Sequence, residues 1–453
     1  MTVTNRFLSN INKYNLIDKN DTIIIGSSGG PDSQFLIYLL NEIKNEYNLT
    51  IILAHLNHLH RKEASFDEKL VIDTGEKLGL KVEVRKASMD ELAKANKISP
   101  EDAGRRLRYE FFNDIASSYR NSKIAVAHNM DDQAETMLFR MARGTGLDGL
   151  AGMDYKNKNI IRPILSFKKS EILEYLNQNN ISYAIDATNL ENDYSRNYIR
   201  NEIFPKISEI NPNAINNFFN LSDIIKNDLA IIDEIIDKKY KEIVINEKDY
   251  FVKFDKGKFE DISYPIKTRL IRIAIFKLTG DTKNISKENI EDFINIENLQ
   301  TGKKIIKDKL VFQKNYNSYE LMILNREQNY SVIKKINLDE EIVFNGRKIK
   351  TSIVFGKKDK SRNVGYFDLD KISFPLTIRT RENGDKFRPI GMDHKKKLKD
   401  FFIDEKIDKS IRDQIPIILS NDDIIWIVGY RISEQFKVDS GTKNILKIEV
   451  EDD

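Results

Sequence analysis

Residues 23–33 have the sequence IIIGSSGGPDS and decide the fold of the N-terminal part of this chain. A run of β-branched residues ends at a Ser/Gly turn, and apolar residues then recur at helical spacing from Phe35 to Leu40. This order predicts a strand, a tight loop and the N-terminus of a helix. Free backbone N–H groups and the helix dipole both point outward at such a loop, so it favours an anionic ligand.

The composition of the loop favours a phosphate over a plain strand-to-helix turn, which a lone Gly-Gly pair would indicate. Glycine lets a phosphate approach the backbone closely, and serine hydroxyls can donate hydrogen bonds. No Lys follows the glycines, so the loop is not a Walker loop. A carboxylate beside a phosphate is repulsive unless a cation lies between them, and Asp32 therefore suggests Mg²⁺. The residues assigned to the phosphate are Ser28, Gly29, Gly30, Pro31, Asp32 and Ser33.

Length and composition indicate a soluble protein of several domains. The 453 residues correspond to about three domains, and 40% of them are hydrophobic, which suffices for ordinary cores. No apolar run approaches the ~18 residues that a membrane span needs. Residues 1–20 are polar and lack the apolar core of a signal peptide. We therefore expect a cytoplasmic protein without a membrane partner.

The residue counts exclude some chemistry and leave other chemistry open. The chain contains no cysteine, which excludes disulfides, thiol nucleophiles and cysteine-ligated iron–sulfur clusters. The net charge is +3, from 73 basic and 70 acidic residues. This near balance neither requires nor excludes a nucleic-acid partner, so local basic patches must decide.

Strand and helix patterns alternate up to about residue 205, which predicts right-handed βαβ units and a doubly wound α/β fold with a parallel sheet. Ligands bind at the carboxyl ends of such strands. We therefore expect the polar loops at 26–33, 55–61 and 128–132 to converge. The expected strands are 22–26, 50–55, 81–86 and 123–127, and the expected helices are 33–46, 65–79, 100–119, 131–143 and 168–179.

The pattern changes twice along the rest of the chain, so we expect three domains: 1–210, 211–328 and 329–453. The middle domain is expected to be mainly helical and to serve packing or partner docking. The last domain is expected to be α+β. The middle elements are helices over 214–242 and 287–297 and strand-like pieces at 250–254 and 308–313, and the C-terminal strands are 340–344, 376–380 and 424–430.

A second polar loop follows the strand expected at 123–127. His128 stands at the strand end, Asp131 is a plausible N-cap, and Asp132 and Glu135 are three residues apart and share a helix face. Acids in a first turn are also favoured by the helix dipole alone. A histidine beside two acids at the mouth of a nucleotide-binding sheet is better explained by a site. Asp132 could bind Mg²⁺ or orient an amine nucleophile, and Glu135 could bind a cationic substrate.

Two further segments carry unusual polar residues. The loop with His55, His58 and His60 holds three of the five histidines. Zinc is disfavoured there, because cysteine is absent and the spacing is only that of a loop, so a solvated, ligand-facing loop is the preferred interpretation. Three arginines at 105–108 precede aromatic residues on an expected helix. One of them, Arg108, could reach a phosphate, while others would lie on the surface.

Taken together, the motifs resemble the bacterial tRNA(Ile)-lysidine synthases, a family of PP-loop ATP pyrophosphatases, over nearly the whole chain. Many ATP pyrophosphatases share the first loop, but its combination with the C-terminal motifs is specific. The chain departs from the family at Leu59-His60, where Gly-Leu is usual, and at Ala187, where Pro is common. The matching motifs are SGGPDS (28–33), AHLNH (54–58), LRYEFF (107–112), AH (127–128), DDQAET (131–136), RGTGL (143–147), IRP (161–163), DATN (186–189), SRN (195–197) with Arg200, IRTRENGDKF (378–387), KKLKDFF (396–402) and WIVGYR (426–431).

The resemblance implies an ATP-dependent carbon–nitrogen ligase that modifies tRNA. In that reaction the C2 oxygen of the wobble cytidine of a CAU-anticodon tRNA(Ile) attacks the α-phosphate of ATP, and pyrophosphate leaves. Free L-lysine then attacks C2 and displaces AMP, which gives lysidine and changes the codon read from AUG to AUA. ATP, Mg²⁺, free lysine and tRNA(Ile) are the implied cofactors and partners. Because lysine must lose a proton before it attacks, activity should rise above neutral pH.

The resemblance also implies roles for individual residues. Asp32 would hold Mg²⁺, and Asp32, His128 and Asp132 would be catalytic, although whether His128 is a base or an orienting group stays open. His55 would join the phosphate loop in binding ATP, and Arg108 and Glu135 would contact lysine or the intermediate. A basic C-terminal set, otherwise explicable as a solubilising face, would contact the tRNA backbone: Arg379, Arg381, Lys386, Arg388, Lys395, Lys396 and Lys397.

Three other functions compete with this interpretation. An adenylating ligase for a small carbonyl substrate would act without tRNA, and a non-catalytic tRNA or nucleotide binder would release no pyrophosphate. A tRNA thiolase is disfavoured by the absence of cysteine. The sequence does not fix the number of Mg²⁺ ions or the oligomeric state, and it leaves a homodimer open.

Overall fold

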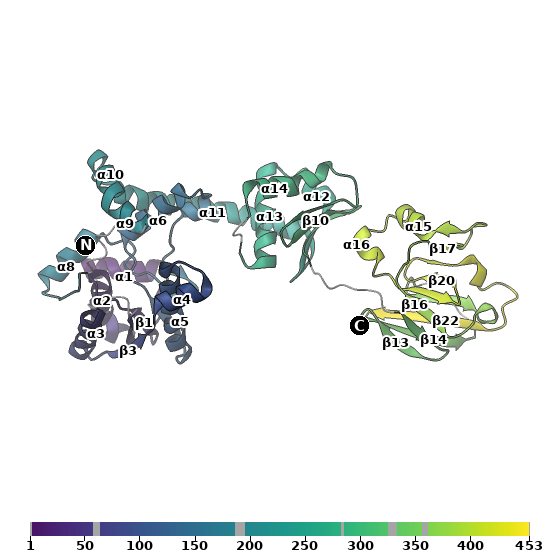
Figure 1. Cartoon of the computed structure of the whole chain (residues 1–453), viewed down its shortest axis with the longest axis horizontal. Helices are drawn as coiled ribbons and strands as arrows, with labels where there is room; N and C mark the ends of the chain where they lie inside the picture. The colour runs from purple at the N-terminus through teal and green to yellow at the C-terminus, as the bar shows by residue number, and fades with distance from the viewer. Residues whose placement is uncertain are drawn as a thin grey trace. The chain divides into compact units, whose positions relative to one another are not determined.

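A computed structural model of the chain describes residues 2–57, 64–185, 195–281, 285–324, 333–355 and 361–452. These residues form two units, Met1–Asp233 and Glu234–Asp453, each of which is described by itself (Figure 1). His58, His60, the departure at Leu59-His60 and the motif with Ala187 lie outside the described residues. None of the helices in the described ranges combines the length and apolar character needed to cross a membrane.

The first unit contains a six-stranded sheet in the order β3-β2-β1-β4-β6-β5. The pairs β1–β2, β2–β3, β1–β4 and β4–β6 are parallel, and only the short β5–β6 pair is antiparallel. The expected parallel sheet of a doubly wound fold is therefore confirmed. The strands are β1 Thr22–Gly26, β2 Thr50–Asn57, β3 Lys81–Lys86, β4 Ser122–Ala125, β5 Lys156–Asn157 and β6 Ile160–Ile161.

Helices cover both faces of this sheet. Successive residues of β1 point to opposite sides, and both sides are apolar, so each face needs a helix to bury it. Ile23 and Ile25 belong to an apolar cluster with Phe35, whereas Ile24 belongs to a cluster with Phe112. The helices are α1 Val3–Lys13, α2 Pro31–Tyr47, α3 Ala64–Leu78, α4 Met89–Asn96, α5 Pro100–Ser117, α6 Met130–Ala142, α7 Leu147–Leu150, α8 Lys169–Gln178, α9 Ser195–Tyr198, the π-helical turn η2 Ile199–Ile203, α10 Phe204–Ile210 and α11 Ala214–Ile243.

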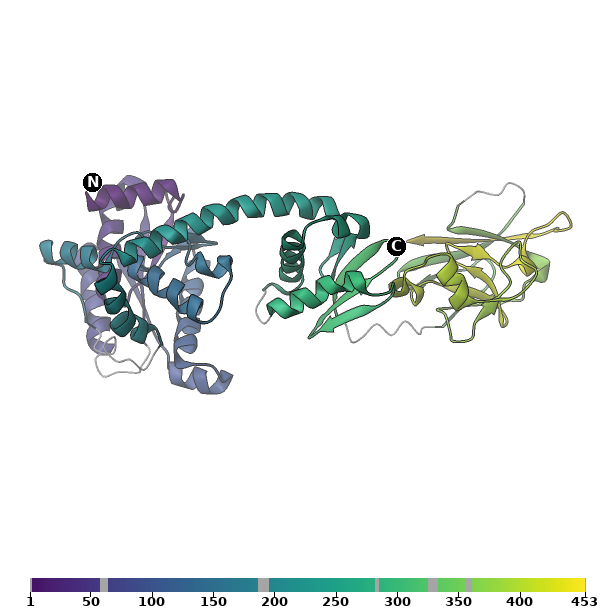
Figure 2. The ribbon, with the colours of Figure 1, turned by 90° about the horizontal axis from the view of Figure 1, so that it is seen from above.

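The segment that follows is helical and also contains an antiparallel sheet in the order β7-β8-β11-β10-β9. Figure 2 shows α11 leading into it as one continuous helix. The two strand-like pieces expected at 250–254 and 308–313 correspond to β8 and β10. Its elements are β7 Val244–Lys248, β8 Phe251–Asp255, α12 Lys256–Asp261, α13 Tyr264–Thr279, α14 Lys287–Ile294, the 3₁₀ turn Asn295–Asn298, β9 Lys304–Lys307, β10 Leu310–Lys314 and β11 Ser318–Ile323.

The C-terminal segment is built from antiparallel sheets and two short helices. Residues of both larger sheets share one apolar core, which includes Ile378 and Trp426 from one sheet and Phe344 and Ile448 from the other. One sheet comprises β12 Lys334–Ile336, β16 Leu376–Arg379, β19 Ile417–Ser420, β20 Asp423–Ile427 and β21 Arg431–Ile432; the other comprises β13 Glu341–Phe344, β14 Arg347–Val354, β22 Ile445–Asp452 and β15 Val364–Asp368. The remaining elements are β17 Lys386–Phe387, β18 Lys396–Lys397, α15 Leu398–Asp404 and α16 Lys409–Arg412.

One expected strand boundary in this segment is wrong. The strand expected over 424–430 ends at Ile427, because the chain turns at Gly429 with a φ of 82°. Glycine adopts this left-handed backbone conformation without the steric cost that a Cβ atom imposes. The expected three-domain division at 210 and 328 stays a prediction.

Candidate active site

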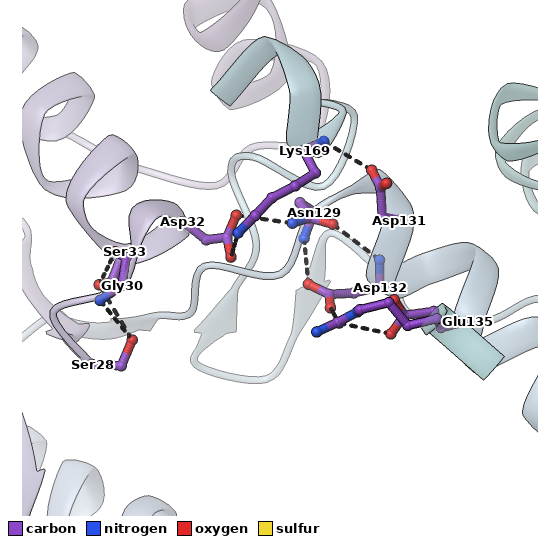
Figure 3. A network of polar contacts seen from close by, with 10 residues as sticks. Ser28, Gly30, Asp32, Ser33, Asn129, Asp131, Asp132, Glu135 and Lys169 are labelled. Carbon is purple, nitrogen blue, oxygen red and sulfur yellow. Dashed lines mark hydrogen bonds and ion pairs between the residues drawn. The ribbon is translucent and has the colours of Figure 1, made fainter. Parts of the chain in front are cut away.

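The loop between β1 and α2 is shaped by contacts among its own residues. Gly30 is the N-cap of α2, and Pro31 occupies the first helical position. A backbone N–H at this position has no partner within the helix, so proline costs no hydrogen bond there. Ser28 Oγ accepts from the Gly30 N–H at 3.3 Å, and Ser33 Oγ donates to the Gly30 carbonyl at 2.8 Å (Figure 3). Two serine hydroxyls and the first turn of a 17-residue helix therefore meet where an anion is expected.

Gly29 is required by the geometry of this loop. Its φ is +79°, and a Cβ at this position would lie 3.4 Å from the backbone oxygen of Asp67 on α3. Its carbonyl accepts from the Ala184 N–H at 2.9 Å. A side chain at 29 would strain the loop, because this positive φ is one that residues with a Cβ rarely adopt.

Asp32 lies at the start of α2 and is held from two other elements. The Asn129 amide donates to one of its carboxylate oxygens at 3.0 Å, and the Lys169 ammonium contacts the other at 2.6 Å (Figure 3). The Lys169 backbone N–H donates to Asp131 at 2.9 Å. The loops at 26–33 and 128–132 therefore converge as expected, and α8 joins them.

The N-terminus of α6 is capped differently from the expectation. Asn129, and not Asp131, is the N-cap. Its side chain accepts from the Asp132 N–H at 3.0 Å, and Asp132 accepts from the Asn129 N–H at 3.0 Å, which completes a capping box. The expectation was wrong because Asn is as good an N-cap as Asp and stands earlier in the segment. Because Asp131 does not cap α6, its carboxylate is available to accept the Lys169 N–H at the start of α8.

Asp132 and Glu135 share a helix face, as expected, and both contact Arg200 from η2. The Arg200 guanidinium donates to both oxygens of Glu135, at 2.6 and 2.9 Å, and to Asp132 at 3.2 Å. The side chain of Glu135 is 5% exposed, whereas that of Arg200 is 42% exposed. A cleft of about 210 Å³ opens beside this ion pair. It is lined by Asp131, Glu135, Arg200, Phe204, Pro205, Ser208 and Ile215.

The electrostatics of Glu135 are those of a buried acid whose charge is only partly compensated. Burial raises the pKa of Glu135 to about 7, against the opposing effect of Arg200, and the neighbouring acids Asp132 and Asp131 add to the rise. The same ion pair raises the pKa of Arg200 despite burial, so the guanidinium stays charged. Glu135 therefore changes charge near neutral pH, which is the range in which catalytic and binding acids act.

His128 lies at the end of β4 and is bound by a residue to which no role was assigned. The Nε of Arg162 donates to His128 Nδ1 at 3.1 Å. Burial and the positive charges of Arg162, Arg105, Arg196 and Arg108 lower the pKa of His128 to about 3. The imidazole is therefore neutral at physiological pH.

His55, which is expected to bind ATP, lies on β2 beside the phosphate loop. Its Nδ1 contacts the Ser27 carbonyl at 2.9 Å, so Nδ1 carries the proton and donates. Its Nε2 and the hydroxyl of Ser27 are buried without a hydrogen-bond partner among the described residues. A buried acceptor without a partner is costly and calls for a ligand or a water. Arg108 lies exposed on α5, near enough to lower the pKa of His128.

The basic C-terminal residues differ in whether their side chains already pair with other residues of the segment. The side chain of Arg379 is 12% exposed and forms a bidentate ion pair with Asp385 at 2.8 and 2.9 Å. A phosphate contact by this residue would have to replace that pair. Ion pairs or hydrogen bonds within the segment also hold Arg381 to Asp413, Arg388 to the Met392 carbonyl and Asp393, Lys395 to Asp423, and Lys396 to Asp404.

Lys386 and Lys397 are arranged differently. They face each other in register on the two-stranded ribbon β17–β18, and both are exposed. Within the described part of the chain, no ion pair of either lysine is found. Like charges directly opposite each other destabilise a ribbon, and an external anion would offset this repulsion.

The structure thus adds four residues to which sequence reasoning assigned no role: Asn129, Arg162, Lys169 and Arg200. Arg162 and Arg200 fall in the quoted motifs, and Asn129 lies between two of them, which was an available signal. Lys169 carried none, because its contact with Asp32 spans 137 positions of sequence.

Comparison with known proteins gives a consistent result over the whole chain. Residues 2–207 match the model of the PP-loop domain, and residues 376–450 match that of the TilS substrate C-terminal domain. The tRNA(Ile)-lysidine synthase of Clostridium tetani is 40% identical over 98% of this chain and 97% of its own. That of Clostridioides difficile is 36% identical over 98% and 99%. A U34-tRNA thiolase structure from Methanococcus maripaludis is 17% identical, with a TM-score of 0.42, over 49% of this chain and 77% of its own.

Proposed function

The chain belongs to the tRNA(Ile)-lysidine synthase family of ATP-dependent ligases, and from this premise we propose that it performs the family's reaction in two steps at the site formed by the phosphate loop and the N-terminus of α6. First, the C2 oxygen of the wobble cytidine in a CAU-anticodon tRNA(Ile) attacks the α-phosphate of ATP, and the bond to pyrophosphate breaks. Second, the amine of lysine bonds to C2, and the C2–O bond breaks to release AMP. The product reads AUA in place of AUG.

The observation that carries the lysine assignment is the charge set at the N-terminus of α6. Asp131, Asp132 and Glu135 supply three carboxylates beside the guanidinium of Arg200. Free lysine carries two amines and one carboxylate, so its charges complement this set. Arg200 is exposed enough to pair with the substrate carboxylate, and the acids would hold or orient the amines.

The phosphate loop is the proposed ATP site. Helix α2 presents its N-terminal dipole to the triphosphate, and Ser28 and Ser33 bring hydroxyl groups to the same loop. The unpartnered Nε2 of His55 is an acceptor, so it would take a hydrogen bond from an amino or hydroxyl group of the nucleotide and not contact a phosphate oxygen. Arg108 is proposed to offset charge on a phosphate or on the adenylated intermediate. The oxyanion charge that develops during adenylation would be stabilised by these fixed dipoles and charges.

The residues present also fit Mg²⁺, which is held in proteins by one or two carboxylates together with substrate phosphates and water. Asp32 stands at the loop, and its carboxylate already accepts the ammonium of Lys169, so the position suits a cation. Among the described residues, no group of three or more acids and histidines suited to a metal is found. When bound, such an ion would neutralise part of the triphosphate charge.

The C-terminal segment is proposed to bind the tRNA backbone. The repelling pair Lys386 and Lys397 is the observation that favours this role, because two unpaired cations on a ribbon match adjacent phosphates. Such contacts would supply affinity and register, while the cytidine itself must be unstacked to enter the site.

The experiment that tests this proposal follows pyrophosphate release from ATP in the presence of lysine and Mg²⁺. A CAU-anticodon tRNA(Ile) transcript should stimulate release, and a transcript with U at the wobble position should not. Release that is independent of tRNA and driven by a small carbonyl compound would favour the alternative ligase. Tight tRNA binding without any release would favour a non-catalytic binder.

A further inference from the structure

The contact between Arg162 and His128 determines which ring nitrogen of His128 carries a proton. Arg162 Nε donates to His128 Nδ1 at 3.1 Å, and a guanidinium has donors only, so it cannot accept a hydrogen bond in return. A ring nitrogen that accepts a hydrogen bond carries no proton. The neutral imidazole therefore has its single N–H at Nε2.

Arg162 is itself fixed in place, so this assignment does not depend on a mobile side chain. The residue is 7% exposed, its NH1 donates to the Asp154 carbonyl at 2.8 Å, and its backbone N–H donates to the Tyr155 carbonyl at 2.8 Å. It directly follows β6, the parallel neighbour of the strand that leads to His128. The sheet thus holds donor and acceptor at adjacent strand ends.

The surroundings also resist a second proton on the ring. Four guanidinium groups act on His128, namely Arg162 after β6, Arg105 and Arg108 on α5, and Arg196 on α9. Like charges oppose formation of an imidazolium, and burial opposes it further. His128 is thus held as a neutral group within a positive field.

We propose that Arg162 is a positioning residue that locks His128 as an Nε2–H donor, and that His128 serves this site by donating a hydrogen bond to a substrate oxygen. It does not serve as the base that removes the proton of the amine. The identity of the oxygen rests on the proposed function: a phosphate or C2 oxygen of the adenylated cytidine. His128 directly precedes Asn129, whose amide binds Asp32 at the start of α2, so the two residues belong to one loop at the carboxyl end of the sheet.

The chemistry favours a donor at this point. As AMP leaves, negative charge grows on its oxygens, and a hydrogen bond aimed at that charge lowers the barrier. Donation from Arg162 to Nδ1 polarises the ring, and this makes the Nε2–H group a stronger hydrogen-bond donor. A neutral imidazole of lowered pKa is suited to this role. No proton moves through His128, so the proton of the amine passes to a carboxylate or to water.

The direct test is ¹⁵N NMR of the full chain with its five histidines labelled, with His128 assigned by the loss of its signal in His128→Gln. We expect the Nε2–H form of His128 at every pH between about 5.5 and 8.5, without titration near the ordinary value of about 6.5. In Arg162→Met, we expect the Nδ1–H and Nε2–H tautomers to mix, because the donor to Nδ1 is gone. An Nδ1–H form, or titration near 6.5 in the unaltered chain, would overturn the proposal.

Two substitutions at His128 provide a kinetic test that does not require altering buried Arg162. The amide nitrogen of Gln can occupy the place of Nε2, whereas that of Asn reaches only the place of Nδ1. We expect AMP release to stay within about tenfold in His128→Gln and to fall by about 10²–10³ in His128→Asn, the usual cost of losing an oxyanion donor. Equal losses in both folded variants would contradict the proposal, because neither amide can act as a base.

The two tests separate this inference from the proposed function. The NMR result requires no substrate, so it stands or falls on the tautomer alone. If the unaltered chain shows no lysine transfer but His128 is in the Nε2–H form, the proposed function fails while the tautomer assignment holds. If lysine is transferred but His128 titrates in the unaltered chain, or AMP release falls equally in His128→Gln and His128→Asn, the inference fails by itself.

Discussion

At the scale of single residues, the site is organised by pairings between groups far apart in the sequence. Asp32 illustrates this, because its carboxylate is bound by Asn129 and Lys169, 97 and 137 positions away. Sequence motifs predicted the acid and its neighbourhood. They could not predict Lys169, since a lysine in a lysine-rich chain carries no signal until the fold places it.

We expect Asp32→Ala to lower the rate of pyrophosphate release by about 10²–10³-fold, because it removes the proposed cation ligand beside the triphosphate. Binding of tRNA should be largely retained. Lys169→Met is the matched control, since it removes the partner of Asp32 but keeps the carboxylate. Pyrophosphate assays and filter binding of labelled tRNA measure the two effects. Normal turnover in Asp32→Ala would show that the assigned role is wrong.

The raised pKa of Glu135 leads to a prediction about pH. Below about 7 the carboxyl is protonated and cannot pair with an amine, and above about 7 it is ionised and can do so. The KM for lysine should therefore fall as pH rises through this value. In Glu135→Gln, KM should be higher and this dependence should vanish. Initial rates at several lysine concentrations across the range provide the measurement, and an unchanged dependence in the variant would exclude Glu135 as its source.

At the scale of elements, the sheet of the first unit was predictable and the exact ends of its elements were less so. The alternation of strand and helix patterns placed all four expected strands. Burial on both faces explains the apolar runs of β1 and β2, whereas β3 lies at the sheet edge and has no buried residue. The N-cap of α6 was misplaced by two residues, since Asn129 and Asp131 satisfy the same capping chemistry. The role of η2 was not foreseen, because Arg200 reaches Glu135 only once the chain has folded.

The packing of β1 against α5 gives a stability prediction. A Cβ at Gly26 would lie 2.6 Å from the ring of Phe112 on α5. This ring is buried in the apolar cluster that contains Ile24. Gly26→Ala should therefore destabilise the first unit by about 1–3 kcal/mol, the usual cost of overpacking. Urea unfolding of the full chain, followed by a probe in the first unit, measures this change.

A double-mutant cycle provides the control for this clash. Phe112→Leu alone should destabilise the unit because it leaves a void, but it makes room for the added methyl group. The combined Gly26→Ala and Phe112→Leu variant should therefore be more stable than the sum of the single effects. Simple additivity would show that the cost of Gly26→Ala comes from elsewhere.

At the scale of the whole molecule, the proposal assigns the chemical steps to the first unit and tRNA binding to the C-terminal segment. The first unit brings together the phosphate loop and the acidic cleft, and the C-terminal segment carries the basic ribbon. Family membership could be predicted because the motifs occur in both units, whereas the ion pairs that commit Arg379 and Arg381 could not be foreseen from charge alone.

The ribbon leads to a prediction about salt. If Lys386 and Lys397 each contact a phosphate, replacing both with Ala should weaken tRNA binding and reduce the slope of log K against log salt by about 1.4–1.8. Replacing Lys303 and Lys304, exposed lysines near the five-stranded sheet, provides a control with the same charge change. Titrations of labelled tRNA at several salt concentrations give both slopes. Equal slopes in the two double variants would remove the ribbon from the tRNA contact.

The central claim is that this chain joins free lysine to the wobble cytidine, and the most direct measurement is incorporation of labelled lysine into a CAU-anticodon tRNA(Ile) transcript with ATP and Mg²⁺. We predict stoichiometric label in this transcript, none in a transcript with U at the wobble position, and loss of label in Asp32→Ala. Absence of label from the CAU transcript, with AMP still formed from ATP, would contradict the account.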